Sequence, residues 1–324
     1  MIVRWGLDEL EPLLNELGFE RPLLISTARW SELELPVAVR FHGVKPHAEI
    51  DSVREATERA AKADGLIALG GGSAIDTGKA VGAATGIATV AVPTTYSGAE
   101  WTDYFGMRDP ERGVKSGGSG PPPVAIVYEP NLTLGLPRGE SGGTALNALA
   151  HCAEALYVSG RNAEGDEQAL AGAPLVAGSL PQVLEDGDDL DARTALLRGA
   201  MHAGAALAAA GLGLGHAMAQ ALGGRYGIPH GAANALCLPP ALRFNRPVVA
   251  TEIARFGDAV GADDPAALAE ELARLAGFER LRDLGVPEDG LDEVAEAAAV
   301  RGGAKANPRP ATPAEIAELL RSVW

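Results

Sequence analysis

The first half of the chain alternates short apolar runs with amphipathic segments. Five runs of apolar and β-branched residues, bounded by glycine, proline or charged residues, predict buried strands at 21–26, 37–41, 65–69, 88–92 and 124–128. Amphipathic segments around residues 10–17 and 48–63 predict helices between and before them. Strands that alternate with helices are typical of a parallel sheet with helical crossovers. The first half therefore predicts an open, doubly wound α/β domain.

The pattern changes near residues 131–138. Residues 109–123 are rich in glycine and proline and predict a loop or a hairpin, and from Ser141 onward the composition is helical and no further strand is expected. A chain of 324 residues fits two domains at roughly 100–200 residues each. We predict a nucleotide-binding α/β domain over residues 1–135 and an all-helical substrate domain over residues 136–324.

Composition and net charge limit the classes of binding partner that we expect. The formal net charge is -16, and a strongly acidic surface repels phosphate backbones and anionic lipid, so neither nucleic acid nor membrane is expected as a partner. The apolar run 203–210 is too short for a membrane span. Cys152 and Cys237 have no metal or redox spacing, which fits a reducing compartment. The first residues lack the blocks of a signal peptide, so a soluble, cytoplasmic protein is expected.

A run of three glycines and a serine, Gly70–Ser73, follows a predicted strand and precedes a predicted helix. Glycine lets a backbone approach a phosphate without a Cβ clash, and the free N–H groups of a helix N-terminus bind anions. Ser73 is expected to cap the helix, with Asp76 three residues later as in a capping box. The run is not GxGxxG, because Ile75 stands where the third glycine would be. From these residues alone, a phosphate loop and an ordinary glycine turn both remain open.

A cluster of hydroxyl side chains, residues 93–100, follows the predicted strand 88–92. Ligands of open α/β sheets bind outside the carboxyl ends of the strands, so the cluster could contact ribose or nicotinamide. An ordinary turn rich in serine and threonine has the same composition, and that interpretation also remains open.

The helical half contains a set of histidines. Asn147 and His151 are four residues apart, which puts both on one helix face, and His216 and Gln220 repeat this spacing. His230 lies in a predicted loop. The three histidines could converge on a metal or on an anionic substrate, although spacing alone does not show that they meet.

Together these segments resemble the iron-containing (group III) alcohol dehydrogenase family, within the dehydroquinate synthase-like superfamily, over nearly the whole chain. The segments that carry the resemblance are 70–79, 92–95, 151–155, 213–219, 229–235 and 307–310. Within the family, the maleylacetate reductase branch is most similar over residues 93–100, 127–130 and 146–157, where Tyr96 is characteristic. Residues 229–235 look more like the alcohol dehydrogenase branch.

The resemblance implies a dinucleotide cofactor, NAD or NADP, with its pyrophosphate at the glycine loop. No acidic residue ends the strand 37–41, where His42 follows instead, so the sequence permits either cofactor. The cofactor-binding residues that we expect are Gly70, Gly71, Gly72, Ser73, Asp76, Thr94, Thr95 and Lys115.

Metal-dependent members of the family use one aspartate and three histidines, and the resemblance implies that the histidines are His151, His216 and His230. The aspartate position is Asn147, whose amide is a weak, neutral ligand. A further family histidine falls at Gln220, which cannot exchange a proton near neutral pH. Both departures weaken a mechanism that uses a metal as Lewis acid.

We therefore predict a metal-free, NAD(P)H-dependent reductase that transfers hydride to an enone or carbonyl of a small carboxylate. The histidines would stabilise the enolate, and Asn147 would orient them. The catalytic residues that we expect are His151, His216, His230, Asn147 and Tyr96. A metal-dependent alcohol dehydrogenase with three histidine ligands, and a non-redox member of the superfamily, are the alternatives. A homodimer is expected from the family.

Overall fold

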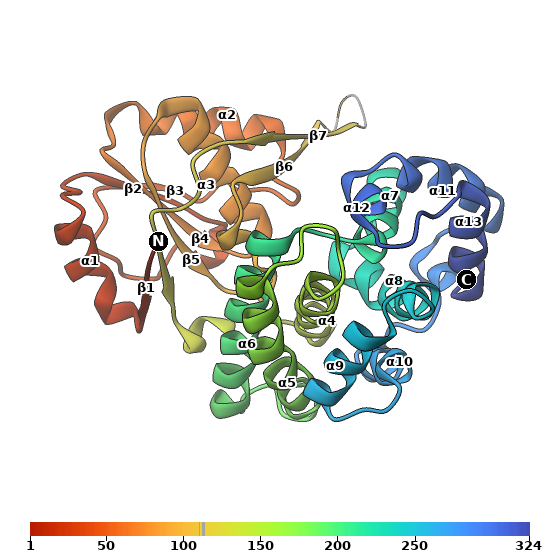
Figure 1. The fold of residues 1–324 in the computed structure, drawn as a ribbon. Helices are drawn as coiled ribbons and strands as arrows, with labels where there is room; N and C mark the ends of the chain where they lie inside the picture. Colours follow the sequence, from red (N-terminus) through yellow and green to blue (C-terminus); the bar gives the residue numbers. More distant parts are fainter. Residues whose placement is uncertain (110, 112–113) are drawn as a thin grey trace. The chain divides into compact units, whose positions relative to one another are not determined.

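The computed structural model describes residues 1–109, 111 and 114–324, and it leaves the side chains of Val114 and Lys115 outside the described part. The chain forms two compact units (Figure 1). Unit 1 comprises Met1–Thr95 and Ala99–Thr133, and unit 2 comprises Tyr96–Gly98 and Leu134–Trp324. The three residues Tyr96–Gly98 thus interrupt unit 1 and pack with unit 2, which no feature of the sequence reveals.

Unit 1 is built on a parallel sheet in the order β1-β8-β5-β4-β2-β3. Its strands are β1 (Ile2–Trp5), β2 (Pro22–Ile25), β3 (Val39–Phe41), β4 (Gly65–Gly70), β5 (Thr89–Pro93) and β8 (Ala125–Tyr128). The predicted doubly wound α/β class is confirmed. The sequence analysis did not predict the edge strand β1. Its four residues are only half-buried, and Arg4 interrupts the apolar run.

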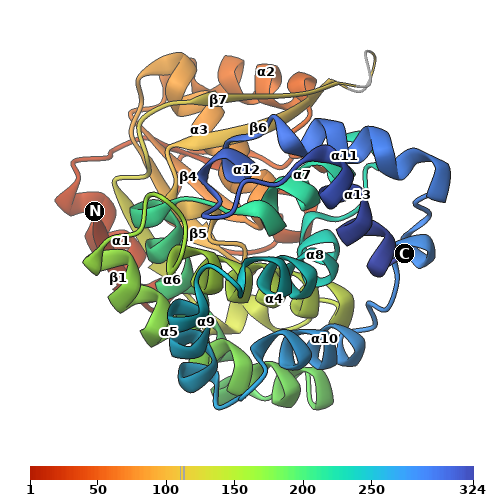
Figure 2. The same cartoon turned by 45° about the vertical axis from the view of Figure 1, so that its right-hand side comes forward.

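Helices cover the sheet of unit 1, and their bounds are α1 (Leu10–Glu16), α2 (Ile50–Arg59) and α3 (Gly72–Thr85). Figure 2 shows α1, α2 and α3 beside the strands of this sheet. Side chains alternate along a strand, so Leu23 packs in one core with residues of α2 and α3, while Leu24 packs in another with residues of α1. Burial on both faces explains why these strands read as unbroken apolar runs.

An antiparallel hairpin, β6 (Tyr104–Asp109) and β7 (Val114–Ser119), leaves the sheet, with Tyr104 opposite Ser119. Residues 109 and 114–119 of the segment predicted as a loop or hairpin belong to these two strands, and β6 begins five residues before that segment. Residues 110, 112 and 113 of that segment lie outside the described part of the chain.

Unit 2 is all-helical after Leu134, and this prediction too is confirmed. The central helix α4 packs against α5, α6 and α8, as Figure 1 shows. The helices are α4 (Arg138–Ala155), α5 (Ala163–Glu185), α6 (Leu190–Ala210), α7 (Leu214–Tyr226), α8 (His230–Asn245), α9 (Ala250–Val260), α10 (Pro265–Leu275), α11 (Leu291–Ala299), α12 (Gly302–Ala306) and α13 (Pro313–Ser322). Nearly every residue of α4 from Ser141 onward is buried, so this helix can hold polar side chains only where they find partners.

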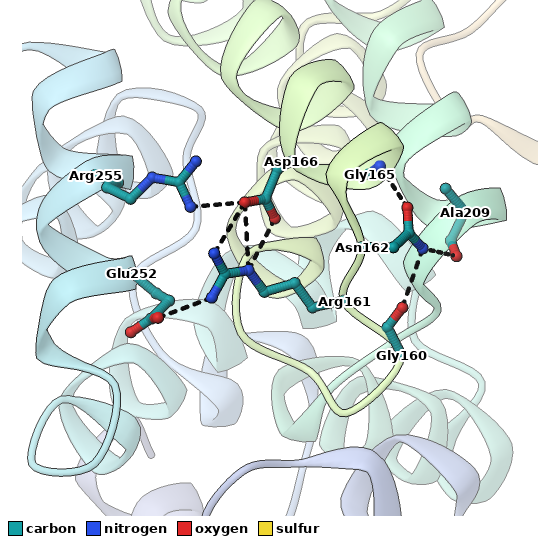
Figure 3. Close-up of polar contacts among 8 residues, drawn as sticks. All are labelled: Gly160, Arg161, Asn162, Gly165, Asp166, Ala209, Glu252 and Arg255. Atoms are coloured by element: carbon teal, nitrogen blue, oxygen red, sulfur yellow. Dashed lines mark hydrogen bonds and ion pairs between the residues drawn. The ribbon is translucent and has the colours of Figure 1, made fainter.

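At the start of α5, side chains of unit 2 form a helix cap and a cluster of ion pairs (Figure 3). Asn162 caps the helix by accepting a hydrogen bond from the N–H of Gly165 at 2.9 Å. Asp166 pairs with Arg161 at 3.0 Å and with Arg255 of α9 at 2.7 Å. The ion pairs tie α5 to α9, and each arginine in this cluster has an acidic partner.

Among the helices that the structure describes, none by itself is long and apolar enough to cross a membrane. The bent pair Leu190–Ala210 and Leu214–Tyr226 passes that test on length and composition alone.

Candidate active site

The glycine loop of unit 1 lies between β4 and α3. Gly70 ends the strand with a φ of 145°, in the region that favours glycine. Gly71 is the N-cap of α3, and no side chain caps the helix from this position, as in helix N-termini that bind anions. A Cβ on Gly71 would lie 2.9 Å from Thr95 Cγ2. The predicted cap by Ser73 is wrong, because its Oγ instead accepts a hydrogen bond from the N–H of His47 at 2.9 Å.

Asp76 has contacts within unit 1 that the sequence did not reveal. Its carboxylate lies 3.0 Å from Lys79 Nζ and accepts a hydrogen bond from the N–H of Gly106 at 3.1 Å. Burial raises the pKa of Asp76, and the Lys79 ammonium opposes that rise. Lys79 is fully buried and donates to the carbonyls of Ala99 and Tyr104. The pair therefore fixes the end of the hydroxyl cluster and the start of the hairpin to α3.

The threonines after β5 lie beside the glycine loop. The N–H of Thr94 donates to the carbonyl of Gly70 at 3.0 Å, so the carboxyl ends of β4 and β5 are joined. Thr95 Oγ1 is buried and has no hydrogen-bond partner among the described residues. An unpaired buried hydroxyl beside an open helix N-terminus fits a polar ligand. Lys115 lies in β7, and its side chain is outside the described part.

The three predicted histidines meet in unit 2. His151 comes from α4, His216 from α7, and His230 is the first residue of α8. The rings of His151 and His216 stack with centroids 4.7 Å apart, and those of His216 and His230 lie 5.7 Å apart. His151 and His216 are buried, whereas His230 is exposed. The convergence that spacing could not show is therefore present.

Asn147 lies at the centre of this cluster. Its Nδ2 donates to the carbonyl of Ser97 at 3.1 Å and lies 3.4 Å from His151 Nε2. Its Oδ1 accepts from Asn234 Nδ2 at 2.7 Å and lies 3.2 Å from His216 Nε2. A backbone carbonyl can only accept, so Ser97 fixes which end of the amide is Nδ2. His151 Nε2 then faces a donor, and His216 Nε2 faces an acceptor and carries a hydrogen.

Glu154 was not assigned a role from the sequence, although it follows His151 by three residues on the same helix. Its Oε2 lies 2.7 Å from His216 Nδ1 and accepts from the N–H of Gly213 at 2.6 Å, and Glu154 is fully buried. A carboxylate that accepts from Nδ1 fixes the ring orientation of a histidine. His216 is therefore held between Glu154 at Nδ1 and Asn147 at Nε2.

Other polar atoms of the cluster have no partner within the described residues. They are Ser97 Oγ, His151 Nδ1 and Asn234 Oδ1, all buried. Burial, and then the neighbouring His216 and His230, lower the pKa of His151 well below its ordinary value. His151 is therefore neutral near physiological pH, and its Nδ1 carries a hydrogen because Nε2 faces the amide donor of Asn147. The site thus holds buried hydrogen-bond groups that no described protein group satisfies, as a ligand-binding site does.

Tyr96 is fully buried, and its hydroxyl accepts a hydrogen bond from Arg193 at 3.1 Å. Arg193 also donates to Ser141 Oγ and to the carbonyls of Gly187 and Leu136. The tyrosine thus anchors the segment 96–98 against α4 and α6, which holds the Ser97 carbonyl that orients Asn147. Its predicted catalytic role stays a prediction, and this geometry assigns it a positioning contact.

Comparisons with known proteins agree with this geometry. Residues 4–129 match the family model of iron-containing alcohol dehydrogenase, and residues 142–324 match the model of its C-terminal region. A maleylacetate reductase from Rhizobium sp. strain MTP-10005 is 35% identical, covering 96% of this chain and 91% of that protein.

Solved structures give the same result. The structure of maleylacetate reductase from Rhizobium sp. strain MTP-10005 superposes with a TM-score of 0.91 at 32% identity, over 100% of this chain and 95% of that one. An iron-containing alcohol dehydrogenase from Corynebacterium glutamicum gives a TM-score of 0.93 at 28% identity, over 100% and 94%.

The fold and the site thus define an NAD(P)H-dependent oxidoreductase, as the sequence implied. The chain belongs to the iron-containing alcohol dehydrogenase family.

Proposed function

We propose that the chain is a maleylacetate reductase that works without a metal. It reduces the carbon–carbon double bond of maleylacetate, which is conjugated with a ketone, and yields 3-oxoadipate. The observation that carries this proposal is the Asn147 amide, which joins Ser97, Asn234 and His216 where metal-dependent relatives supply a carboxylate. Curated maleylacetate reductases that align over nearly the full chain support the choice of substrate.

The chemistry adds one hydride and one proton to the double bond. The reduced nicotinamide supplies the hydride when it is bound. Negative charge then collects on the ketone oxygen, and preorganised hydrogen-bond donors stabilise such an oxyanion. Solvent protonates the enolate carbon, and the His216 ring, held between Glu154 and Asn147, keeps the donor array in place. The neutral His151 offers its unpaired Nδ1–H as a donor.

The donor set supports a metal-free site. His151 Nε2 lies 3.4 Å from Asn147 Nδ2, and His230 Nε2 lies 3.0 Å from Asn234 Nδ2. The lone pairs of these two ring nitrogens therefore accept hydrogen bonds. His216 Nε2 faces the Asn147 oxygen. Within the described residues, no group of three or more His, Cys, Asp or Glu side chains is arranged to hold a metal ion. These contacts and the missing carboxylate at Asn147 favour hydrogen-bond chemistry over metal binding.

The cofactor roles proposed for unit 1 follow the loop geometry. Gly70 and Gly71 allow close approach of a pyrophosphate, and the open start of α3 binds it. Thr95 Oγ1 supplies an unpaired hydroxyl. We assign the remaining dinucleotide contacts to Gly72, Ser73, Asp76, Thr94 and Lys115, and we expect both NADH and NADPH to serve. A cytoplasmic location and a homodimer complete the proposal.

The test is oxidation of NADH and NADPH with maleylacetate by protein treated with EDTA and assayed for residual metal. Turnover with no metal present is the expected result. Turnover only after zinc or iron is restored would assign the metal-dependent alcohol dehydrogenase mechanism instead. No turnover with maleylacetate, aldehydes or ketones under either condition would favour a non-redox member of the superfamily.

A further inference from the structure

Arg301, at the N-cap of α12, is a half-buried cation with almost no partner. Its Nε is buried and has no hydrogen-bond acceptor among the described residues. One terminal nitrogen donates to Gln220 Oε1 at the long distance of 3.5 Å. No acidic side chain within the described part forms an ion pair with it, and burial lowers the pKa of the guanidinium. Among the described arginines and lysines, Arg301 is the one with a buried nitrogen that lacks a hydrogen-bond partner.

Other arginines of unit 2 show what is missing at Arg301. The buried Arg193 donates to four oxygen acceptors. Arg161 and Arg255 are paired with acidic side chains (Figure 3). Leaving a buried charged donor unpaired costs free energy, so such a group is retained where a ligand completes it. The planar fork of a guanidinium matches a carboxylate in a bidentate geometry.

Within unit 2, Arg301 lies near the histidine cluster through its contact with Gln220. Gln220, which contacts Arg301, follows His216 by four residues in α7 and lies on the same helix face, about 6 Å along the axis. The segment is held there by close packing, since a Cβ on Gly303 would lie 2.3 Å from the carbonyl oxygen of Gly213. One helical turn is comparable with the length of a short dicarboxylate.

We propose that Arg301 binds one carboxylate of the substrate and that Gln220 orients the guanidinium. The carboxylate in question is the one on the side of the ketone away from the reacting double bond. The inference rests on the proposed function, because it names how that substrate is recognised. It makes Arg301 a specificity-determining residue that favours a dicarboxylate over a monocarboxylate. It also gives a reason for glutamine at position 220, since its amide oxygen accepts from the guanidinium and a protonated histidine there would repel it.

The test is isothermal titration in the presence of NAD⁺ with two ligands, 3-oxoadipate and 4-oxopentanoate, which lacks the carboxylate in question. We expect Arg301→Met to weaken 3-oxoadipate binding about 10- to 100-fold, as the loss of hydrogen bonds to a charged group implies. Binding of 4-oxopentanoate should stay within about threefold, and Arg301→Lys should be intermediate because lysine keeps the charge without the fork.

The exposed Arg280→Met is the matched control and should change neither affinity. Because Arg301 is unsatisfied without ligand, Arg301→Met should unfold at the same temperature as the wild type or higher. Equal loss of both ligands, unchanged 3-oxoadipate binding, or a wild type that binds neither ligand would overturn the assignment. Turnover of maleylacetate is measured on the same preparation, so absent turnover with Arg301-dependent binding would reject only the proposed substrate.

Discussion

The substitution Asn147→Asp tests the logic of the histidine cluster most directly. It replaces Nδ2, a donor to the Ser97 carbonyl at 3.1 Å and a neighbour of His151 Nε2 at 3.4 Å, by an acceptor oxygen. Two buried acceptors lose their donor, each at a cost of about 1–3 kcal/mol, and a carboxylate oxygen is brought against a carbonyl oxygen. We expect a loss of about 2–5 kcal/mol, which corresponds to a fall in Tm of about 5–15 °C for a unit of this size.

The variant should also respond differently to pH and metal. The introduced carboxyl avoids the clash only by keeping a proton, so its folded pKa lies above the unfolded value and the loss of stability grows as pH rises beyond about 4. Zinc should raise the Tm of Asn147→Asp but not that of the wild type. At a hundredfold excess of zinc over its Kd, the gain in the free energy of unfolding is about 3 kcal/mol. Scanning calorimetry at several pH values measures both effects. The exposed Asn15→Asp serves as control.

The reasoning would be refuted if Asn147→Asp melted with the wild type at neutral pH. It would also fail if zinc stabilised both proteins equally, because the wild-type cluster would then be a metal site despite its amide.

Four further outcomes follow from the structure. Gly71→Ala should weaken NADH binding at least tenfold with a small change in Tm, because the added Cβ would lie 2.9 Å from Thr95 Cγ2. Fluorescence titration measures the affinity for NADH. Glu154→Gln should lower kcat about 100-fold with little change in KM, since His216 loses the carboxylate that fixes its ring in the cluster. An unchanged kcat would remove this residue from the mechanism. Tyr96→Phe should lower Tm by several degrees and kcat by less than tenfold, because the lost hydroxyl accepts a hydrogen bond from a buried arginine. A far larger fall in kcat would show that the phenol acts in catalysis. His151 is neutral when folded and protonates more readily when unfolded, so stability should fall as pH drops below about 6.5, and His151→Gln should flatten that profile in urea titrations.

Much of the site could be predicted because its chemistry follows local spacing. Asn147 and His151 share a helix face by their separation alone, and the glycine loop follows from a strand, three glycines and a helix. The fold class followed from the change of hydrophobic period near residue 135. The short strand β1 did not follow, because a four-residue edge strand with an arginine carries no such period.

What the sequence could not supply are contacts between segments far apart in the chain. Glu154 becomes a partner of His216 only when α4 packs beside α7, 62 residues later, and the Tyr96 segment joins the helical unit through Arg193, 97 residues away. The sequence by itself determined which chemical groups are present and which helix faces carry them. Only the tertiary structure decided which of these groups satisfy one another and which are left for a ligand, because pairing depends on distance in space and burial decides what an unpaired group costs.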